Sequence, residues 1–338
     1  MPELALLILV IAAAIGFGVV NGFNDAANAV AASIGSRALS PRNGIILTSF
    51  CNFAGAATGT AVAVTIGKGI LDPEIVASLP VITAFLILIS ALLAVIIWGT
   101  VATRLGLPVS ITHGFVTGLA AAGGAVVGWD AVIWSILGRI GASVVAAPTL
   151  GFIGGFVLMI VLLWLFRRSA PARMRIVFSR LQWLTTAFLA YSHGKNDGQM
   201  PIGVITMALV IHTGQIEMWS NIPWWVIVMS ALAISLGTAV GGWRVIKTVG
   251  IKITALQPVH GFATQASAAT VIEVASRLGI PVSTTHCVAA ATMGVGATKR
   301  LSAVRWGVTR NIVLAWVLTF PICGVLGWII ASLLKLAF

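Results

Sequence analysis

The stretch "TRLGLPVSITHG", residues 103–114, recurs further along the chain as "SRLGIPVSTTHC", residues 276–287. A second pair keeps nearly the same separation, because "FNDAANAV" (23–30) is echoed by "KNDGQMPI" (195–202). Self-similarity at one fixed separation is typical of a duplicated structural unit. The sequence therefore predicts two copies of one fold within a single chain.

The border between the two copies is a hydrophilic segment, "RRSAPARMRIVFSR" (167–180), which holds five Arg. We expect a first transmembrane repeat at 1–166, this Arg-rich segment as a cytoplasmic linker, and a second transmembrane repeat at 181–338.

The composition indicates a membrane protein. Of the 338 residues, 59% are apolar and only 8% are charged, and the mean hydropathy is +1.06, whereas soluble domains carry about 25% charged residues. We expect an all-α polytopic membrane protein, with runs of roughly 20 apolar residues crossing the bilayer. Ten such runs are present: 4–33, 44–67, 81–105, 131–149, 150–166, 182–211, 223–243, 253–277, 303–320 and 321–337.

The relative orientation of the repeats follows from the number of spans. Each repeat is expected to hold about five spanning helices plus one short tract rich in Gly, Ala, Ser and Thr, at 108–128 and 281–297. These tracts are interpreted as re-entrant hairpins, since irregular backbone is tolerated in a membrane where protein or water covers it. An odd number of crossings predicts inverted-topology repeats.

The basic residues predict the orientation in the membrane. Lys and Arg are enriched in cytoplasmic loops, which places the linker in the cytoplasm and both termini outside it. Arg37, Arg42 and Arg104 agree with this orientation, whereas Lys299, Arg300 and Arg305 fall on the wrong side of the predicted topology.

The net charge of +12 does not indicate a nucleic-acid partner, because the basic residues are spread over the segment ends. They suit contact with the anionic head groups of a lipid bilayer. Cys51, Cys287 and Cys323 are scattered without CxxC spacing and indicate neither a structural metal site nor a redox site.

Four polar residues interrupt the first apolar run. Asn21, Asn24, Asp25 and Asn28 lie at helical spacing i, i+3, i+4 and i+7 and so share one face. A carboxylate at the bilayer centre costs about 2.5–3.5 kcal/mol even on the lenient scale. These groups therefore call for a neighbouring helix, a cavity or an ion as partner.

The two short tracts supply groups that attract anions. Pro108 and Pro281 are suited to the first turn of a helix, and a helix N-terminus carries about half a positive charge. Two such starts, one from each repeat, would converge on one small oxyanion at the midplane, although simple N-capping by the hydroxyls is the alternative. The hydroxyl-bearing residues beside these starts are Ser110, Thr112, Ser283, Thr284 and Thr285.

Each tract continues with a histidine, His113 or His286, for which a structural role and proton handling remain open. Asp25 and Asp197 have three possible tasks: to hold a coupling cation such as Na⁺, to take up a proton, or to accept a proton from the ligand. Hydrogen phosphate carries such a proton at neutral pH, and sulfate does not.

The motifs "GFNDAANAV", "HGKNDGQ", "PVSITH" and "PVSTTH" resemble those of the inorganic phosphate transporter (PiT) family over essentially the whole chain. The resemblance implies inverted repeats, two re-entrant hairpins and import of phosphate coupled to a Na⁺ or H⁺ gradient by alternating access. It implies no cofactor, although some bacterial members carry a neutral metal–phosphate complex. The short linker suggests a compact prokaryotic member in the plasma (inner) membrane, and a homo-oligomer is open.

The resemblance also implies roles for individual residues. Phosphate ligands are expected at Ser110, Thr112, Ser283, Thr284, Thr285, Asn24 and Asn196. The coupling ion or proton is expected at Asp25, Asn28, Asp197 and Gln199. Three positions depart from the family pattern: Ile111 removes a hydroxyl from the first tract, Gln199 and Met200 alter the second Asn-Asp motif, and Gln265 stands where many members carry an acid.

Three other functions are alternatives to phosphate transport. A permease for sulfate or another tetrahedral oxyanion on the same fold is the nearest alternative. A membrane-embedded phosphoryl-transfer enzyme would need a nucleotide loop or a carboxylate cluster, and the chain has eight acids, mostly isolated. A passive anion channel would line its path with rings of Lys or Arg, and few lie within the apolar runs.

Overall fold

A computed structural model describes residues 2–337 of the chain. Nearly all of these residues are helical and none belongs to a β-strand of a sheet, so the prediction of an all-α chain is confirmed. In chain order the elements are α1 (Pro2–Gly35), α2 (Pro41–Ala56), α3 (Ala61–Lys68), α4 (Pro73–Ser78), α5 (Val81–Leu105), α6 (Ile111–Val126), η1 (Trp129–Ala131), α7 (Trp134–Leu165), α8 (Pro171–Asp197), α9 (Gln199–Thr213), η2 (Ile216–Trp219), α10 (Trp224–Val240), α11 (Trp243–Lys247), η3 (Thr248–Lys252), α12 (Pro258–Arg277), α13 (Thr284–Ala297), η4 (Leu301–Ala303) and α14 (Trp306–Ala337).

Four helices, α1, α5, α7 and α14, are long and apolar enough to cross a membrane. Two bent pairs, α2 with α3 and α10 with α11–η3, raise the number to six if each counts as one span; the two halves of each pair meet at 68° and 62°. The predicted count of ten spans is therefore not confirmed by the described residues.

Helices α7 and α14 correct two parts of the predicted topology. The pairs of spans expected within 131–166 and 303–337 each form one helix of 32 residues. Pro148 and Pro321 lie near the expected borders, yet inside these helices. Membrane helices tolerate an interior proline, and half of such a helix, about 25 Å long, is too short for a core of about 30 Å. Each pair is thus one crossing.

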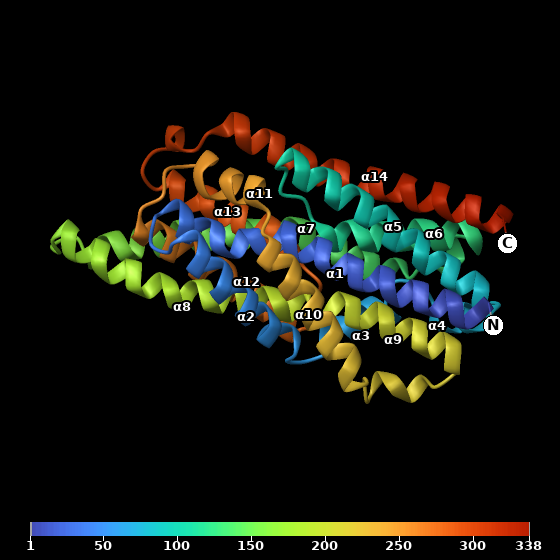
Figure 1. Cartoon of the computed structure of the whole chain (residues 1–338). Helices are drawn as coiled ribbons and strands as arrows, with labels where there is room; N and C mark the ends of the chain where they lie inside the picture. The colour runs from blue at the N-terminus through green and yellow to red at the C-terminus, as the bar shows by residue number, and fades with distance from the viewer. Residues whose placement is uncertain (1, 338) are drawn as a thin grey trace.

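The two halves of the chain run in opposite directions along the molecule (Figure 1). Helix α1 runs from the end that holds both chain termini, here the termini end, towards the end that holds the connection between α7 and α8, here the linker end. Helices α8 and α9 run back, and α7 and α14 are likewise opposed. The short helices α6 and α13 both begin in the middle of the molecule and run to opposite ends.

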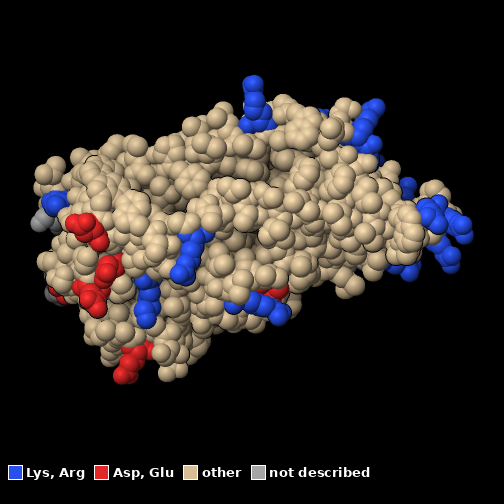
Figure 2. Space-filling view, turned by 180° about the vertical axis from the view of Figure 1, so that it is seen from behind, with Lys and Arg blue, Asp and Glu red and all other residues tan. Residues whose placement is uncertain are grey.

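Charge is distributed unevenly between these two ends (Figure 2). Basic side chains gather at the linker end, whereas acids gather at the termini end, where Glu3 begins α1 and Glu74 lies in α4. The expected linker is partly helical, because α8 begins at Pro171.

One disagreement in the predicted topology disappears in the structure. Lys299 and Arg305 donate to backbone carbonyls of residues 251–255, which precede the start of α12 at the linker end. Placing Lys299, Arg300 and Arg305 on the side opposite the linker was therefore wrong. The reason is that α14 crosses the molecule once and not twice.

The two halves interlock. Helix α7 of the first half packs on α12 and α13, whereas α14 of the second half packs on α5 and α6. Each half therefore covers the short helix of the other.

Two equivalent hydrogen bonds also connect the bent helix pair of each half to the other half. Thr65 in α3 donates to the Gly279 carbonyl at 2.8 Å, and Thr248 in η3 donates to the Gly106 carbonyl at 2.9 Å. Gly106 and Gly279 have φ of +73° and +66°, a backbone region that favours glycine. Both turns lead directly into the extended segments before α6 and α13.

Candidate functional site

The short helices α6 and α13 begin at buried serines. The Ser110 side chain accepts from the His113 amide, and the Ser283 side chain accepts from the His286 amide, at 3.2 Å each. Both serines are N-caps with extended backbone. The predicted helix starts are present as a matched pair in the interior, but they lie at Ser110 and Ser283; Pro108 and Pro281 are in the extended segments before them and not in the first turn. The two serine oxygens serve as caps, as in the alternative of simple N-capping.

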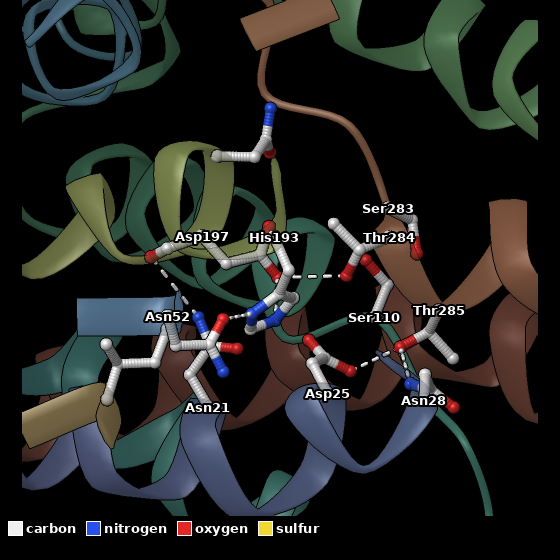
Figure 3. Close-up of polar contacts among 12 residues, drawn as sticks. Asn21, Asp25, Asn28, Asn52, Ser110, His193, Asp197, Ser283, Thr284 and Thr285 are labelled. Atoms are coloured by element: carbon white, nitrogen blue, oxygen red, sulfur yellow. Dashed lines mark hydrogen bonds and ion pairs between the residues drawn. The ribbon is translucent and has the colours of Figure 1, made fainter. Parts of the chain in front are cut away.

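The polar face of α1 meets the start of α13 at one threonine (Figure 3). Thr285 donates its hydroxyl to the Asp25 carboxylate and accepts from the Asn28 amide at 2.8 Å. Asp25 and Asn28 are 2% and 1% exposed. The carboxylate on α1 is thus fixed by the first turn of the helix from the other half.

The second carboxylate, Asp197 at the end of α8, is bound by the neighbouring threonine. Thr284 donates to Asp197 Oδ2 at 3.1 Å, and His193 Nε2 lies 3.3 Å from the same oxygen. One potential ligand atom from each of Asp25, His193 and Asp197 lies within 4.8 Å of the others, and all three residues are buried. The structure therefore brings together two acids that lie 172 residues apart in the sequence (197 minus 25), together with the imidazole of His193.

A chain of hydrogen bonds determines the tautomer of His193. Thr238 donates to the Ile234 carbonyl at 2.8 Å and so accepts from the Asn52 amide at 3.0 Å. The Asn52 oxygen consequently faces His193 Nδ1, at 2.8 Å, and Nδ1 must donate. In a neutral ring Nε2 then presents a lone pair to Asp197.

Two lone pairs facing each other in a buried site are unfavourable unless a proton or a cation lies between them. His193 and Asn52 were not among the predicted site residues. The available signal was the spacing of His193, four residues before Asp197 in "HGKND".

Asn24 and Asn196 occupy equivalent places next to the two acids. The Asn24 amide donates to Thr103 at 2.5 Å, and the Asn196 amide donates to Ser276 at 3.0 Å. Asn196 also accepts from the Val282 backbone amide at 3.2 Å. Both asparagines therefore hold the ends of α5 and α12, just before the turns into the short helices.

Gln199 and Gln265 are both bonded to protein groups through their oxygen and their nitrogen. The Gln199 oxygen accepts from the Val62 and Ala63 amides at 2.9 and 3.2 Å, which caps the start of α3. The Gln265 amide nitrogen lies within 3.0 Å of Ser33 Oγ and Thr186 Oγ1, and its oxygen accepts from Thr185 at 2.9 Å. In this position the Gln199 oxygen, with two donors, is not free to hold an ion.

The two histidines of the short helices face each other behind the helix starts. The His113 and His286 ring centroids are 5.4 Å apart, and the His286 ring stacks on Trp316 at 4.0 Å. Their ring nitrogens bond to no described residue. Thr112, also buried, has no described partner for its hydroxyl, while the position of Thr284 is occupied by Ile111 in the first repeat.

These groups favour opposite charges on adjacent sides of one site. Helix starts with free amide groups favour an anion, and oxygen-rich clusters favour a cation. Several buried oxygens beside the acids have no described partner: Asn21 Oδ1, Asn24 Oδ1, Asn28 Oδ1 and Asp197 Oδ1. The arrangement suits an oxyanion bound next to a cation or a proton.

Comparison with known proteins agrees with this chemistry. The phosphate transporter family matches residues 21–177 and 166–327. A protein of Bacillus subtilis, named a probable low-affinity inorganic phosphate transporter, is 38% identical over 99% of both chains. A protein of the same name from Rhizobium meliloti is also 38% identical, over 94% of this chain and 92% of its own. A solved structure, "The sodium-dependent phosphate transporter", superposes with a TM-score of 0.87 at 29% identity, covering 99% of this chain and all of the other.

Proposed function

Because the chain belongs to the phosphate transporter family, we propose that it imports inorganic phosphate by secondary active transport through the site between α1, α6, α8 and α13. Membership indicates transport and not catalysis. The observation that carries the proposal is the pairing of Asp25 with Thr285 and of Asp197 with Thr284, which joins both acids to one helix start.

Phosphate would bind between the starts of α6 and α13. The backbone amides there supply donors without a fixed positive charge, and the proposed ligands are Ser110, Thr112, Ser283, Thr284, Thr285, Asn24 and Asn196. Thr284 and Thr285 now donate to carboxylates. An arriving anion would therefore compete with Asp197 and Asp25 for these hydroxyls, which links anion binding to the charge state of the acids.

The coupling cation would sit on the acids, with Asp25, Asn28 and Asp197 as its ligands and Gln199 close by in sequence. The solved relative is titled sodium-dependent, and a proton is the other candidate. A divalent metal accompanying phosphate as a neutral complex would use the same acids. The bonds of Gln199 to α3 would have to break for it to take part.

The movement we propose is alternating access between two inverted repeats, 1–166 and 181–338. It is supported by the opposed directions of α6 and α13 (Figure 1). It is also supported by the equivalent hydrogen bonds that Thr65 and Thr248 donate to the Gly279 and Gly106 carbonyls. The basic linker end would face the cytoplasm, which places the termini end outside, in a prokaryotic plasma membrane.

The test is uptake of labelled phosphate into proteoliposomes, with Na⁺ and pH gradients imposed separately. Asp25→Asn and Asp197→Asn should each abolish gradient-driven accumulation while the protein remains in the membrane, because the amide cannot hold the cation's charge. Wild-type rates in both variants would remove these acids from the mechanism.

The same assay separates phosphate from sulfate. A carboxylate beside the anion favours a ligand that carries a proton, as hydrogen phosphate does. Arsenate should therefore compete with phosphate, whereas competition by sulfate would favour the alternative of a general tetrahedral-oxyanion permease.

A further inference from the structure

A three-residue ion network lies just outside the candidate site. Glu273 in α12 is bound through one oxygen, Oε1, by Lys195 Nζ at 2.6 Å and by Arg277 Nε at 2.8 Å. The side chains of Lys195 and Glu273 are 17% and 10% exposed, whereas that of Arg277 is 72% exposed. The network carries a net charge of +1.

Its place in the chain ties this network to the site. Lys195 directly precedes Asn196 and Asp197, and Arg277 directly follows Ser276, the partner of Asn196. Residues 57–59, at the bend between α2 and α3, and residues 277–278 are exposed. The network is therefore exposed to water at Arg277, while Lys195 adjoins the site residue Asn196 in the chain.

The first repeat has no equivalent network. Arg104 matches Arg277 in the duplicated motif, but Phe23 and Thr100 stand where Lys195 and Glu273 stand. Arg244 donates to the Arg104 carbonyl, and no acid pairs with either arginine among the described residues. The ends of α5 and α12 thus differ in charge although their motifs match.

Helix α12 runs from the linker end to the middle of the molecule (Figure 1), and Arg277 is its last residue, at the end that points towards the termini end. Helix α5 runs the other way, with Arg104 in its last turn, at the end that points towards the linker end. In the proposed orientation Arg277 lies on the extracytoplasmic side, from which phosphate would arrive.

The terminal nitrogens of the Arg277 guanidinium are available to a ligand. Glu273 engages only Nε, and neither terminal nitrogen bonds to a described residue. An arginine held through Nε can present its two terminal N–H groups to a tetrahedral oxyanion in a bidentate contact. Lys195, bound to the same Glu273 oxygen and directly before Asn196 in the chain, adds a second positive charge.

We propose that Arg277 and Lys195, held in place by Glu273, form a capture site for phosphate on the extracytoplasmic side of the transport site. The proposal rests on the proposed function. Glu273 orients the two cations and offsets one of their charges, so that the captured anion is released inwards and not retained.

The test compares Arg277→Gln with its repeat partner Arg104→Gln in cells that lack other phosphate transporters. Positive charge at a binding cleft raises association rates by about 10-fold or more. We expect Arg277→Gln to lower Vmax/KM roughly tenfold through KM, with Vmax nearly unchanged. The Vmax/KM of Arg277→Gln should also depend less on ionic strength. Arg104→Gln should leave KM, Vmax and the dependence on ionic strength unchanged.

Glu273→Gln provides the opposite change, since it raises the net charge of the network from +1 to +2. Its Vmax/KM should fall more steeply with ionic strength than that of the wild type. The proposal is overturned if Arg277→Gln lowers Vmax alone, or if its dependence on ionic strength equals that of the wild type, because a purely structural ion pair gives these results. Failure of the wild type to accumulate phosphate would instead overturn the proposed function.

Discussion

At the scale of single residues, the site depends on hydroxyl and imidazole groups that make two contacts at once. Thr285 serves both Asp25 and Asn28, while His193 connects Asp197 to Asn52. A buried hydrogen bond to a charged group contributes about 1.5–3 kcal/mol. Loss of one such contact therefore changes the position or the charge of a carboxylate.

His193 is expected to position Asp197 through its Nε2. His193→Ala and Asn52→Leu should each reduce phosphate uptake roughly tenfold or more, because about 1.5–3 kcal/mol is lost at the acid. Uptake is measured per amount of protein in the membrane, so that poor insertion is distinguished from poor transport. His212→Ala, at a histidine outside the site, is the control, and an unchanged rate in Asn52→Leu would contradict the tautomer argument.

At the scale of elements, each short helix depends on the turn before it. The turn is shaped by a glycine with positive φ, held by a threonine from the other half, and followed by a serine cap. The asparagines of the two Asn-Asp motifs brace the same segments. The elements that carry the site are therefore positioned by both repeats: the threonine comes from the opposite repeat and the asparagine from the same one.

Gly106→Ala and Gly279→Ala should destabilise the protein. An L-residue at φ of +73° or +66° costs about 1–2 kcal/mol, and a Cβ at Gly106 would meet Arg244 Cβ at 3.1 Å. We expect a lower Tm in detergent for both variants. Gly138→Ala, within α7 and with nothing within 4 Å of the new Cβ, should keep or raise the Tm, and equal losses in all three would contradict this account.

At the scale of the whole molecule, the chain is two opposed halves that cover each other's short helices. One crossing by α14, and not two, puts residues 299–305 at the linker end together with the Arg-rich segment. The Arg-rich segment and residues 299–305 then fall on the same side, as the positive-inside rule expects.

Cysteine labelling tests this arrangement in intact cells after replacement of the three native cysteines. Ser302→Cys and Ala170→Cys, both exposed, should react with a membrane-impermeant reagent only after the membrane is opened. Leu336→Cys, 85% exposed near the end of α14, should react from outside. Reaction of Ser302→Cys from outside would restore two crossings in 303–337 and contradict the single helix.

Much of the architecture was predictable, because it depends on local composition and on duplication. The apolar runs predicted a membrane protein, and the repeated motifs predicted a matched pair of helix starts, which the structure contains at Ser110 and Ser283 and not at Pro108 and Pro281. The errors arose at Pro148 and Pro321, where the effect of a proline depends on the neighbouring helices that satisfy the backbone. No local sequence pattern indicates whether such neighbouring helices are present.

The sequence by itself determined that the chain is helical, apolar, built for a membrane and duplicated, since periodicity, composition and repetition are properties of neighbouring residues. Only the tertiary structure decided that Thr284 and Thr285 hold the acids of α8 and α1, that Gln199 caps α3, and that His193 faces Asp197. Except for the pair of His193 and Asp197, these contacts join residues far apart in the chain. They form because buried polar groups find their hydrogen-bond partners on other helices, some in the same half and some in the other.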